Sequence, residues 1–111
     1  MSHGMTFVET SLFTRQMNEC STDDELRMLQ IELIANPEKG AVIPGAGGLR
    51  KVRMGIGNSG KSGGARVINY FAQPEYIYLL FVYLKSKKIN LSAKEKSILT
   101  TLVAQLKGDM K

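Results

Sequence analysis

The chain has 111 residues, 43% of them apolar, and a formal net charge of +5. This length predicts a single domain over residues 1–111, and the apolar content excludes an intrinsically disordered chain. Its one cysteine, Cys20, excludes an internal disulfide, and no stretch resembles a signal peptide or a membrane span, so we expect a cytoplasmic protein. We interpret residues 1–4 as a leader ahead of a start at Met5.

The N-terminal third predicts one strand and two helices. Residues 5–9 are rich in Thr, Phe and Val and predict an edge strand. Residues 10–19 predict a short helix with a buried face of Leu12, Phe13 and Met17. A capping box formed by Thr22 and Glu25 predicts a second helix, which ends by Asn36 because a proline follows. Its expected buried stripe consists of Leu26, Leu29, Leu33 and Ile34.

The rest of the chain predicts a sheet and a third helix. After a turn-rich connector at residues 36–48, strands are expected at residues 49–54, 65–71 and 76–84. Their short connections predict an antiparallel meander, in which the apolar run 76–84 is a central strand covered on both faces.

A second capping box, Ser92 with Glu95, begins the last helix, and Gly108 is expected at its C′ position. Its expected buried residues are Ile98, Leu99, Leu102, Val103 and Leu106. The predicted fold class is α+β, with a mainly antiparallel twisted sheet, two N-terminal helices and one C-terminal helix.

Charge divides the chain into two unlike parts. Residues 1–38 carry a net charge of −5, and residues 39–111 carry +10. Strand alternation puts Lys51 and Arg53 on one face of the sheet and Val52 and Met54 on the other. This cationic surface on an apolar backing predicts a polyanionic partner, and we expect a nucleic acid and no membrane.

Two motif matches are rejected. Residues 55–62 match the P-loop pattern, and their glycines also match GxGxxG, but a P-loop needs a helix that begins at its lysine. Here two more glycines and a predicted strand follow Lys61, so no nucleotide cofactor is expected. The acidic cluster after Thr22 is explained by helix capping, and no metal site is expected because no histidine lies nearby.

RNA is a polyanion that can be cleaved without a metal, because its 2′-OH can attack the adjacent phosphate. A site must remove that proton, stabilise the added negative charge and protonate the leaving oxygen. Arg53, Arg66 and Lys51 are expected on neighbouring strands, where they can converge on one phosphate. Lys85 is expected at the same end of the sheet, and Tyr83 shares its strand face. These five residues are the catalytic candidates.

Four further cations are candidates for RNA binding: Arg50, Lys61, Lys87 and Lys88. For Arg50 and Lys61, phosphate contact and plain solubility are both open interpretations. For Lys87 and Lys88, the competing interpretation is a solvated run of charge.

The stretch LRKVR, the loop that ends GKSGGARVI and the strand that ends YLKSK resemble the HigB branch of the RelE superfamily of type II toxin–antitoxin toxins. The resemblance covers about residues 5–107. It implies a small α+β ribonuclease fold and cleavage of mRNA on the ribosome, with contacts to 16S rRNA. It also implies a HigA-like antitoxin with a helix-turn-helix domain.

The resemblance assigns site positions to Lys51, Arg53 and Arg66, and a further one to Lys85 or Lys87. Residues 89–92 lack the tyrosine of some relatives, so the general base is open between Lys51, our first choice, and Tyr83. The alternative function is a non-catalytic RNA- or ribosome-binding module. Charge complementarity predicts an acidic antitoxin segment on the basic face, against the alternative that the antitoxin binds the acidic helical part.

Overall fold

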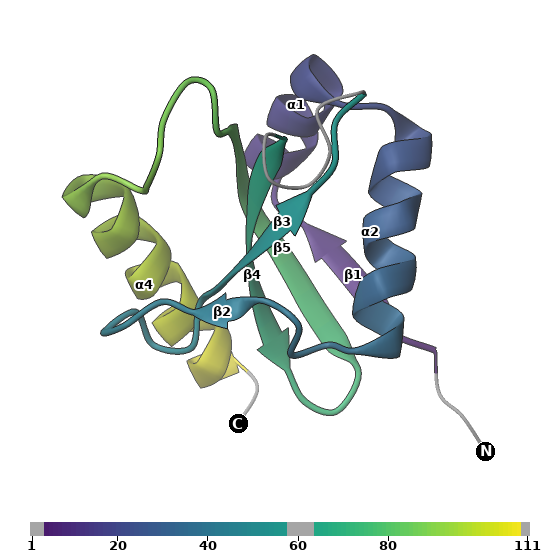
Figure 1. Cartoon of the computed structure of the whole chain (residues 1–111). Coiled ribbons are helices and arrows are strands. Elements are labelled where there is room, and N and C mark those ends of the chain that lie inside the picture. The colour runs from purple at the N-terminus through teal and green to yellow at the C-terminus, as the bar shows by residue number, and fades with distance from the viewer. Residues whose placement is uncertain (1–3, 58–63, 110–111) are drawn as a thin grey trace.

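A five-stranded mixed sheet with helices on both faces forms the protein in the computed structural model, which describes residues 4–57 and 64–109 (Figure 1). Its strands are β1 (Thr6–Glu9), β2 (Ala41–Val42), β3 (Arg50–Met54), β4 (Ala65–Ala72) and β5 (Tyr76–Leu84). Its helices are α1 (Ser11–Cys20), α2 (Asp23–Ala35) and α4 (Ala93–Asp109). The predicted α+β class is confirmed, whereas Lys61 and residues 1–3 of the expected leader lie outside the described residues.

The strands lie in the order β1-β5-β4-β3-β2. The predicted antiparallel meander of β3, β4 and β5 is confirmed. β1 pairs in parallel with β5, with Thr6 opposite Tyr76, which makes the sheet mixed. The two-residue strand β2 was not predicted, because its residues lie in the turn-rich connector and pair only with Lys51 and Arg50 of β3.

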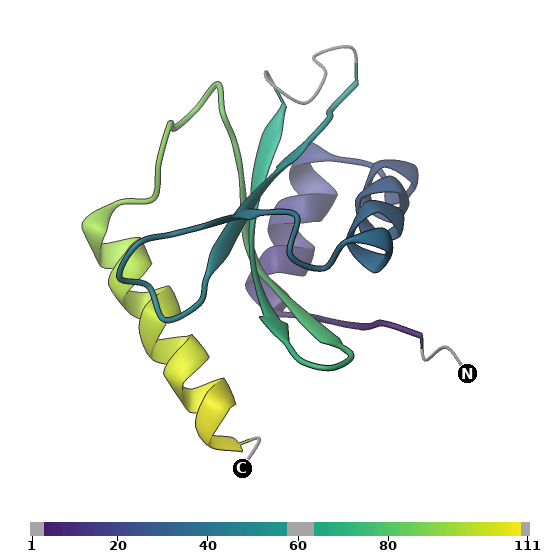
Figure 2. The same ribbon diagram turned by 60° about the horizontal axis from the view of Figure 1, so that its bottom comes forward.

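The sheet separates two apolar cores. Figure 2 shows α4 on one side of the sheet and α1 and α2 on the other. The core under α1 and α2 includes Phe13, Leu33 and Val67, and the core under α4 includes Ile68, Leu80 and Val103. Because β5 contributes to both cores, the prediction that residues 76–84 are covered on both faces is confirmed. The middle position itself belongs to β4.

Helix beginnings follow the sequence closely. Thr22 and Glu25 form the predicted capping box of α2, which ends at Ala35 with Asn36 as its cap. At α4, the Ser92 N–H donates to Glu95 Oε1 at 2.8 Å and the Glu95 N–H donates to Ser92 Oγ at 3.0 Å, which confirms the second box. The predicted end at Gly108 is wrong, because α4 continues to Asp109.

Three residues predicted to be core are on the surface. Leu12 is 37% exposed, Ile34 54% and Ile98 57%. Each lies at the margin of its helical stripe, and one sheet face covers only the central residues, such as Phe13, Leu33 and Leu99. No helix among residues 4–57 and 64–109 combines the length and the apolar composition needed to cross a membrane.

Candidate functional site

Three candidate side chains form a row across the sheet face that α4 covers. Arg53 of β3 pairs with Arg66 of β4, and Arg66 pairs with Tyr83 of β5. Residues directly opposite on neighbouring strands point to the same face, with Cβ atoms about 4.5–5.5 Å apart. Arg53 and Arg66 therefore face each other across β3 and β4.

The two arginines of the row differ in exposure. Arg53 is exposed, whereas Arg66 is 7% exposed and donates from Nη1 to the Ala65 carbonyl at 3.2 Å. Lys51 lies two pairs further along β3, opposite Ile68, on the same face. Its Nζ donates to Asn90 Oδ1 at 3.2 Å. The structure thus brings Lys51, Arg53 and Arg66 together on one face, as the strand alternation predicts.

Tyr83 lies at the β5 end of the row. It is 7% exposed, and its hydroxyl donates to the Ile89 carbonyl at 3.3 Å. Burial raises the pKa of Tyr83, only partly opposed by the positive charge of Arg66. The hydroxyl is therefore protonated near neutral pH and can donate a hydrogen bond.

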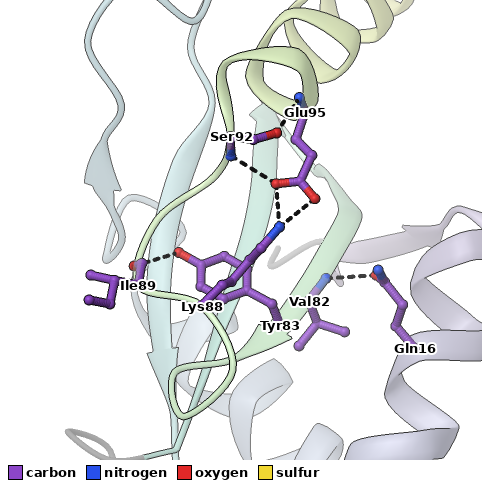
Figure 3. A network of polar contacts seen from close by, with 7 residues as sticks. All are labelled: Gln16, Val82, Tyr83, Lys88, Ile89, Ser92 and Glu95. Carbon is purple, nitrogen blue, oxygen red and sulfur yellow. Dashed lines mark hydrogen bonds and ion pairs between the residues drawn. The ribbon is translucent and has the colours of Figure 1, made fainter.

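A polar network joins Tyr83 to the beginning of α4 (Figure 3). The Lys88 ammonium donates to both carboxylate oxygens of Glu95 and lies 5.7 Å from the ring centre of Phe81 and 5.9 Å from that of Tyr83. Hydrogen bonds from Lys88 and from the Ser92 N–H lower the pKa of Glu95. Lys88 is half-buried and paired, so its interpretation as part of a solvated run is wrong.

A match to a known protein family identifies the class to which this chain belongs. Residues 5–110 match the family model described as the RelE toxin of the RelE/RelB toxin–antitoxin system. The chain belongs to the RelE toxin family. Membership makes it a toxin-type component of a toxin–antitoxin system and implies an antitoxin as its partner.

The other candidate cations of this RelE-family chain are dispersed. Lys85 is exposed just past β5, and its N–H donates to the Gly64 carbonyl at 2.9 Å, where β4 is about to begin. Lys87 is exposed and lines a hollow of about 350 Å³ that also contacts Tyr83. Lys61 lies outside the described residues, so nothing places it relative to the row.

Arg50 is not part of the basic face. Strand alternation directs it away from Lys51 and Arg53, toward the face that α1 and α2 cover. Its guanidinium donates from Nη1 to the carbonyls of Glu38 at 3.0 Å and Gly40 at 2.9 Å, and it pairs with the Glu38 carboxylate at 3.7 Å. These contacts hold the connector that carries β2.

The sequence did not identify three residues that hold the site: Glu25, Asn90 and Glu95 in its role as a partner of Lys88. Glu25 Oε2 accepts from the Gly57 N–H at 2.6 Å, which ties the glycine-rich stretch after β3 to the beginning of α2. This bond is the main reason that the pKa of Glu25 is lowered. The capping boxes were visible in the sequence, but the long-range bonds of the same carboxylates were not.

A metal-binding cluster is not found in the part of the chain that the structure describes, where no three His, Cys, Asp or Glu side chains converge. Cys20 lines the same hollow as Lys87, and burial raises the pKa of its thiol. The side chains of Arg53, Arg66, Tyr83 and Lys51 carry guanidinium, phenol and ammonium groups.

Proposed function

We propose that this RelE-family toxin belongs to the HigB branch and is a metal-independent endoribonuclease that cleaves mRNA on the ribosome. The observation that carries the proposal is the row of Arg53, Arg66 and Tyr83, flanked by Lys51 on one sheet face. Guanidinium groups bind two phosphate oxygens at once and stay charged, which suits them to the extra negative charge of the transition state. The family match supports the toxin class.

The proposed chemistry divides among the site residues. Lys51 is the general base: it takes the proton of the 2′-OH, whose oxygen attacks the phosphorus. Arg53 and Arg66 hold the phosphate oxygens, and Tyr83 donates a hydrogen bond, since its raised pKa makes it a poor base. The bond to the 5′-oxygen breaks, and that oxygen takes a proton, for which Lys85 is the candidate acid. The products are a 2′,3′-cyclic phosphate and a 5′-hydroxyl end.

Further cations extend the proposed surface. Lys87 is exposed and lines the same hollow as Tyr83, and we assign to it contacts with the phosphates of mRNA and 16S rRNA. Lys88 can add to this field only beside its partner Glu95.

Induced expression in a bacterium, followed by mapping of mRNA 5′ ends, tests the proposal. The expected result is growth arrest with new 5′-hydroxyl ends inside translated reading frames. Arrest without new ends would contradict nuclease activity and favour the alternative, a non-catalytic module that binds RNA or the ribosome through the same basic face.

Two further measurements test the metal-independent mechanism and the assignment to the HigB branch. Cleavage in an assay in which polyamines keep the ribosome intact should persist in EDTA; activity that returns only with added Zn²⁺ or Mn²⁺ would contradict the metal-independent mechanism. For the HigB branch, we expect the gene of this chain to lie beside one for a small helix-turn-helix protein. An antitoxin of another class would contradict that assignment.

A further inference from the structure

The connector between β5 and α4, residues 85–92, is tied to the site at two consecutive residues. The Tyr83 hydroxyl donates to the Ile89 carbonyl at 3.3 Å, and Lys51 Nζ donates to Asn90 Oδ1 at 3.2 Å. Tyr83 belongs to β5 and Lys51 to β3, which lie on either side of β4. Residues 89 and 90 therefore span β4 close to the pair of Arg66 with Tyr83.

The two oxygen atoms of the connector occupy positions that a substrate needs. Lys51 and Tyr83 are two of the residues that the proposed function directs at RNA, Lys51 as the base for the 2′-OH and Tyr83 as a hydrogen-bond donor. Both donate instead to an oxygen atom of the chain itself. Arg66 lies on β4, between the strands of Lys51 and Tyr83, and is 7% exposed.

These two contacts are weak enough for a phosphate to replace them. Distances of 3.2 and 3.3 Å are long for hydrogen bonds with a nitrogen and an oxygen donor, respectively. A bond from an ammonium to an anionic oxygen is shorter, about 2.7–2.9 Å, and stronger. Ile89 is 73% exposed and Asn90 is exposed as well, so little buried apolar surface holds this part of the connector down.

The connector is held more firmly at Lys88 than at residues 89 and 90. Lys88 donates to both oxygens of Glu95 and lies over two aromatic rings, and Glu95 also caps α4 (Figure 3). A segment anchored at Lys88 and at Ser92 can release residues 89 and 90 without loss of α4.

We propose that residues 89 and 90 form a strap that imitates the substrate and closes the site in the free protein. Single-stranded RNA displaces the strap when one RNA oxygen replaces Asn90 Oδ1 at Lys51 and another replaces the Ile89 carbonyl at Tyr83. The inference rests on the proposed function for the identity of the ligand. The closed state itself rests on the contacts alone.

Asn90→Ala tests the strap, because it removes the bond to Lys51 from an exposed position outside the RNA-binding residues. The affinity for a fluorescein-labelled single-stranded 12-mer RNA, measured by anisotropy, should rise about two- to tenfold, the range that corresponds to one net hydrogen bond. Ser86→Ala, at an exposed position of the same connector, is the matched control and should leave the affinity unchanged.

A second variant reverses the effect. Asn90→Asp gives Lys51 a carboxylate partner, which should hold the strap closed and lower the RNA affinity more than Ser86→Asp, which adds the same charge to the same connector. In a Lys51→Ala background, Asn90→Ala should no longer change the affinity, because the bond it removes is already absent.

A measurement without RNA separates the strap from the proposed function. In the free protein, Asn90→Ala should raise the rate at which an amine-acylating reagent modifies Lys51, relative to Lys94 on α4, as followed by mass spectrometry. Failure of the wild type to bind the 12-mer would overturn the competition with RNA, whereas the proposed function itself is tested by the mapping of mRNA 5′ ends. Faster modification of Lys51 in Asn90→Ala would then still support the closed state. RNA affinity that falls or stays the same in Asn90→Ala, with unchanged Lys51 modification, would overturn the strap.

Discussion

Two arginines face each other across β3 and β4, and their surroundings differ. Arg53 is exposed and can contact an approaching anion first. Arg66 is almost fully buried between Arg53 and Tyr83. Buried guanidinium groups interact more strongly with a bound anion, because less water screens them. Arg66 is therefore the residue on which the proposed cleavage depends most.

Arg66→Ala should lower the rate of mRNA cleavage about 10²–10³-fold, because one preorganised donor to the phosphate is lost. Mapping of 5′ ends over time after induction measures the rate, and the melting temperature of the purified variant checks the fold. Arg27→Ala, which removes an exposed arginine on α2, should cleave at the wild-type rate. A folded Arg66→Ala protein as active as Arg27→Ala would exclude Arg66 from the site.

Asn69 of β4 is the second residue at which burial is costly. It is fully buried on the sheet face that α1 and α2 cover, and neither Oδ1 nor Nδ2 has a hydrogen-bond partner among the described residues. Asn69→Val should raise the free energy of unfolding by about 1–2 kcal/mol, because an unpaired amide leaves the core and a strand-favouring side chain replaces it. Urea unfolding measures the change. Destabilisation of the same size would indicate that the amide is hydrogen-bonded, for example to a buried water.

At the scale of elements, the beginning of α4 serves both the helix and the site. The Glu95 carboxylate caps the Ser92 N–H and also accepts both bonds from Lys88, whose ammonium lies over the Tyr83 ring. The stability of the N-terminal end of α4 and the position of residues 85–92 are thus coupled through the Glu95 side chain.

Glu95→Gln should lower the free energy of unfolding by about 1 kcal/mol at pH 7, because the amide can still cap the Ser92 N–H but no longer forms an ion pair with Lys88. Because the folded-state pKa of Glu95 lies below its ordinary value of 4.5, its contribution is complete above that value. It is lost as the pH falls through the lowered pKa. Urea unfolding at pH 7 and pH 3 should therefore show a difference between wild type and variant that shrinks at pH 3. A difference equal at both values would contradict this role of the carboxylate.

At the scale of the whole molecule, the sheet separates two kinds of surface. The face with Lys51 and Arg53 is cationic. Tyr83 lies on the same face and donates to the Ile89 carbonyl in the connector between β5 and α4. On the other side, the outward face of α2 exposes three large apolar residues among acids: Met28 at 61%, Ile31 at 53% and Ile34 at 54%. An antitoxin can bind either of these two surfaces, and electrostatic steering of an acidic segment favours the cationic face with Lys51 and Arg53.

Lys51→Glu combined with Arg53→Glu should slow association with the antitoxin at least about tenfold at low salt, because it reverses the field that steers an acidic segment. Stopped-flow association at several salt concentrations measures this, and the wild-type rate should fall as salt rises. Arg15→Glu with Arg27→Glu makes the same charge change on α1 and α2 and should have little effect. An unchanged rate in the first variant, together with loss of binding in Ile31→Asp, would assign the antitoxin to α2.

Features that depend on neighbours within a few residues could be predicted from the amino-acid sequence alone. A capping box spans three residues, so Thr22 and Ser92 marked the beginnings of α2 and α4. Strand alternation has a period of two, so Lys51 and Arg53 were assigned correctly to one face. Composition alone revealed the segregation of charge.

Contacts between residues far apart in the chain, in contrast, became known only from the fold. The register of β3, β4 and β5 placed Arg66 between Arg53 and Tyr83, and the bond from Lys51 to Asn90 joins residues 39 apart in the chain. The exposure of Ile34 and Ile98 depends on how far the sheet extends beneath each helix, which no helical period contains. Contacts of this kind follow from the packing of whole layers, and local sequence patterns do not specify that packing.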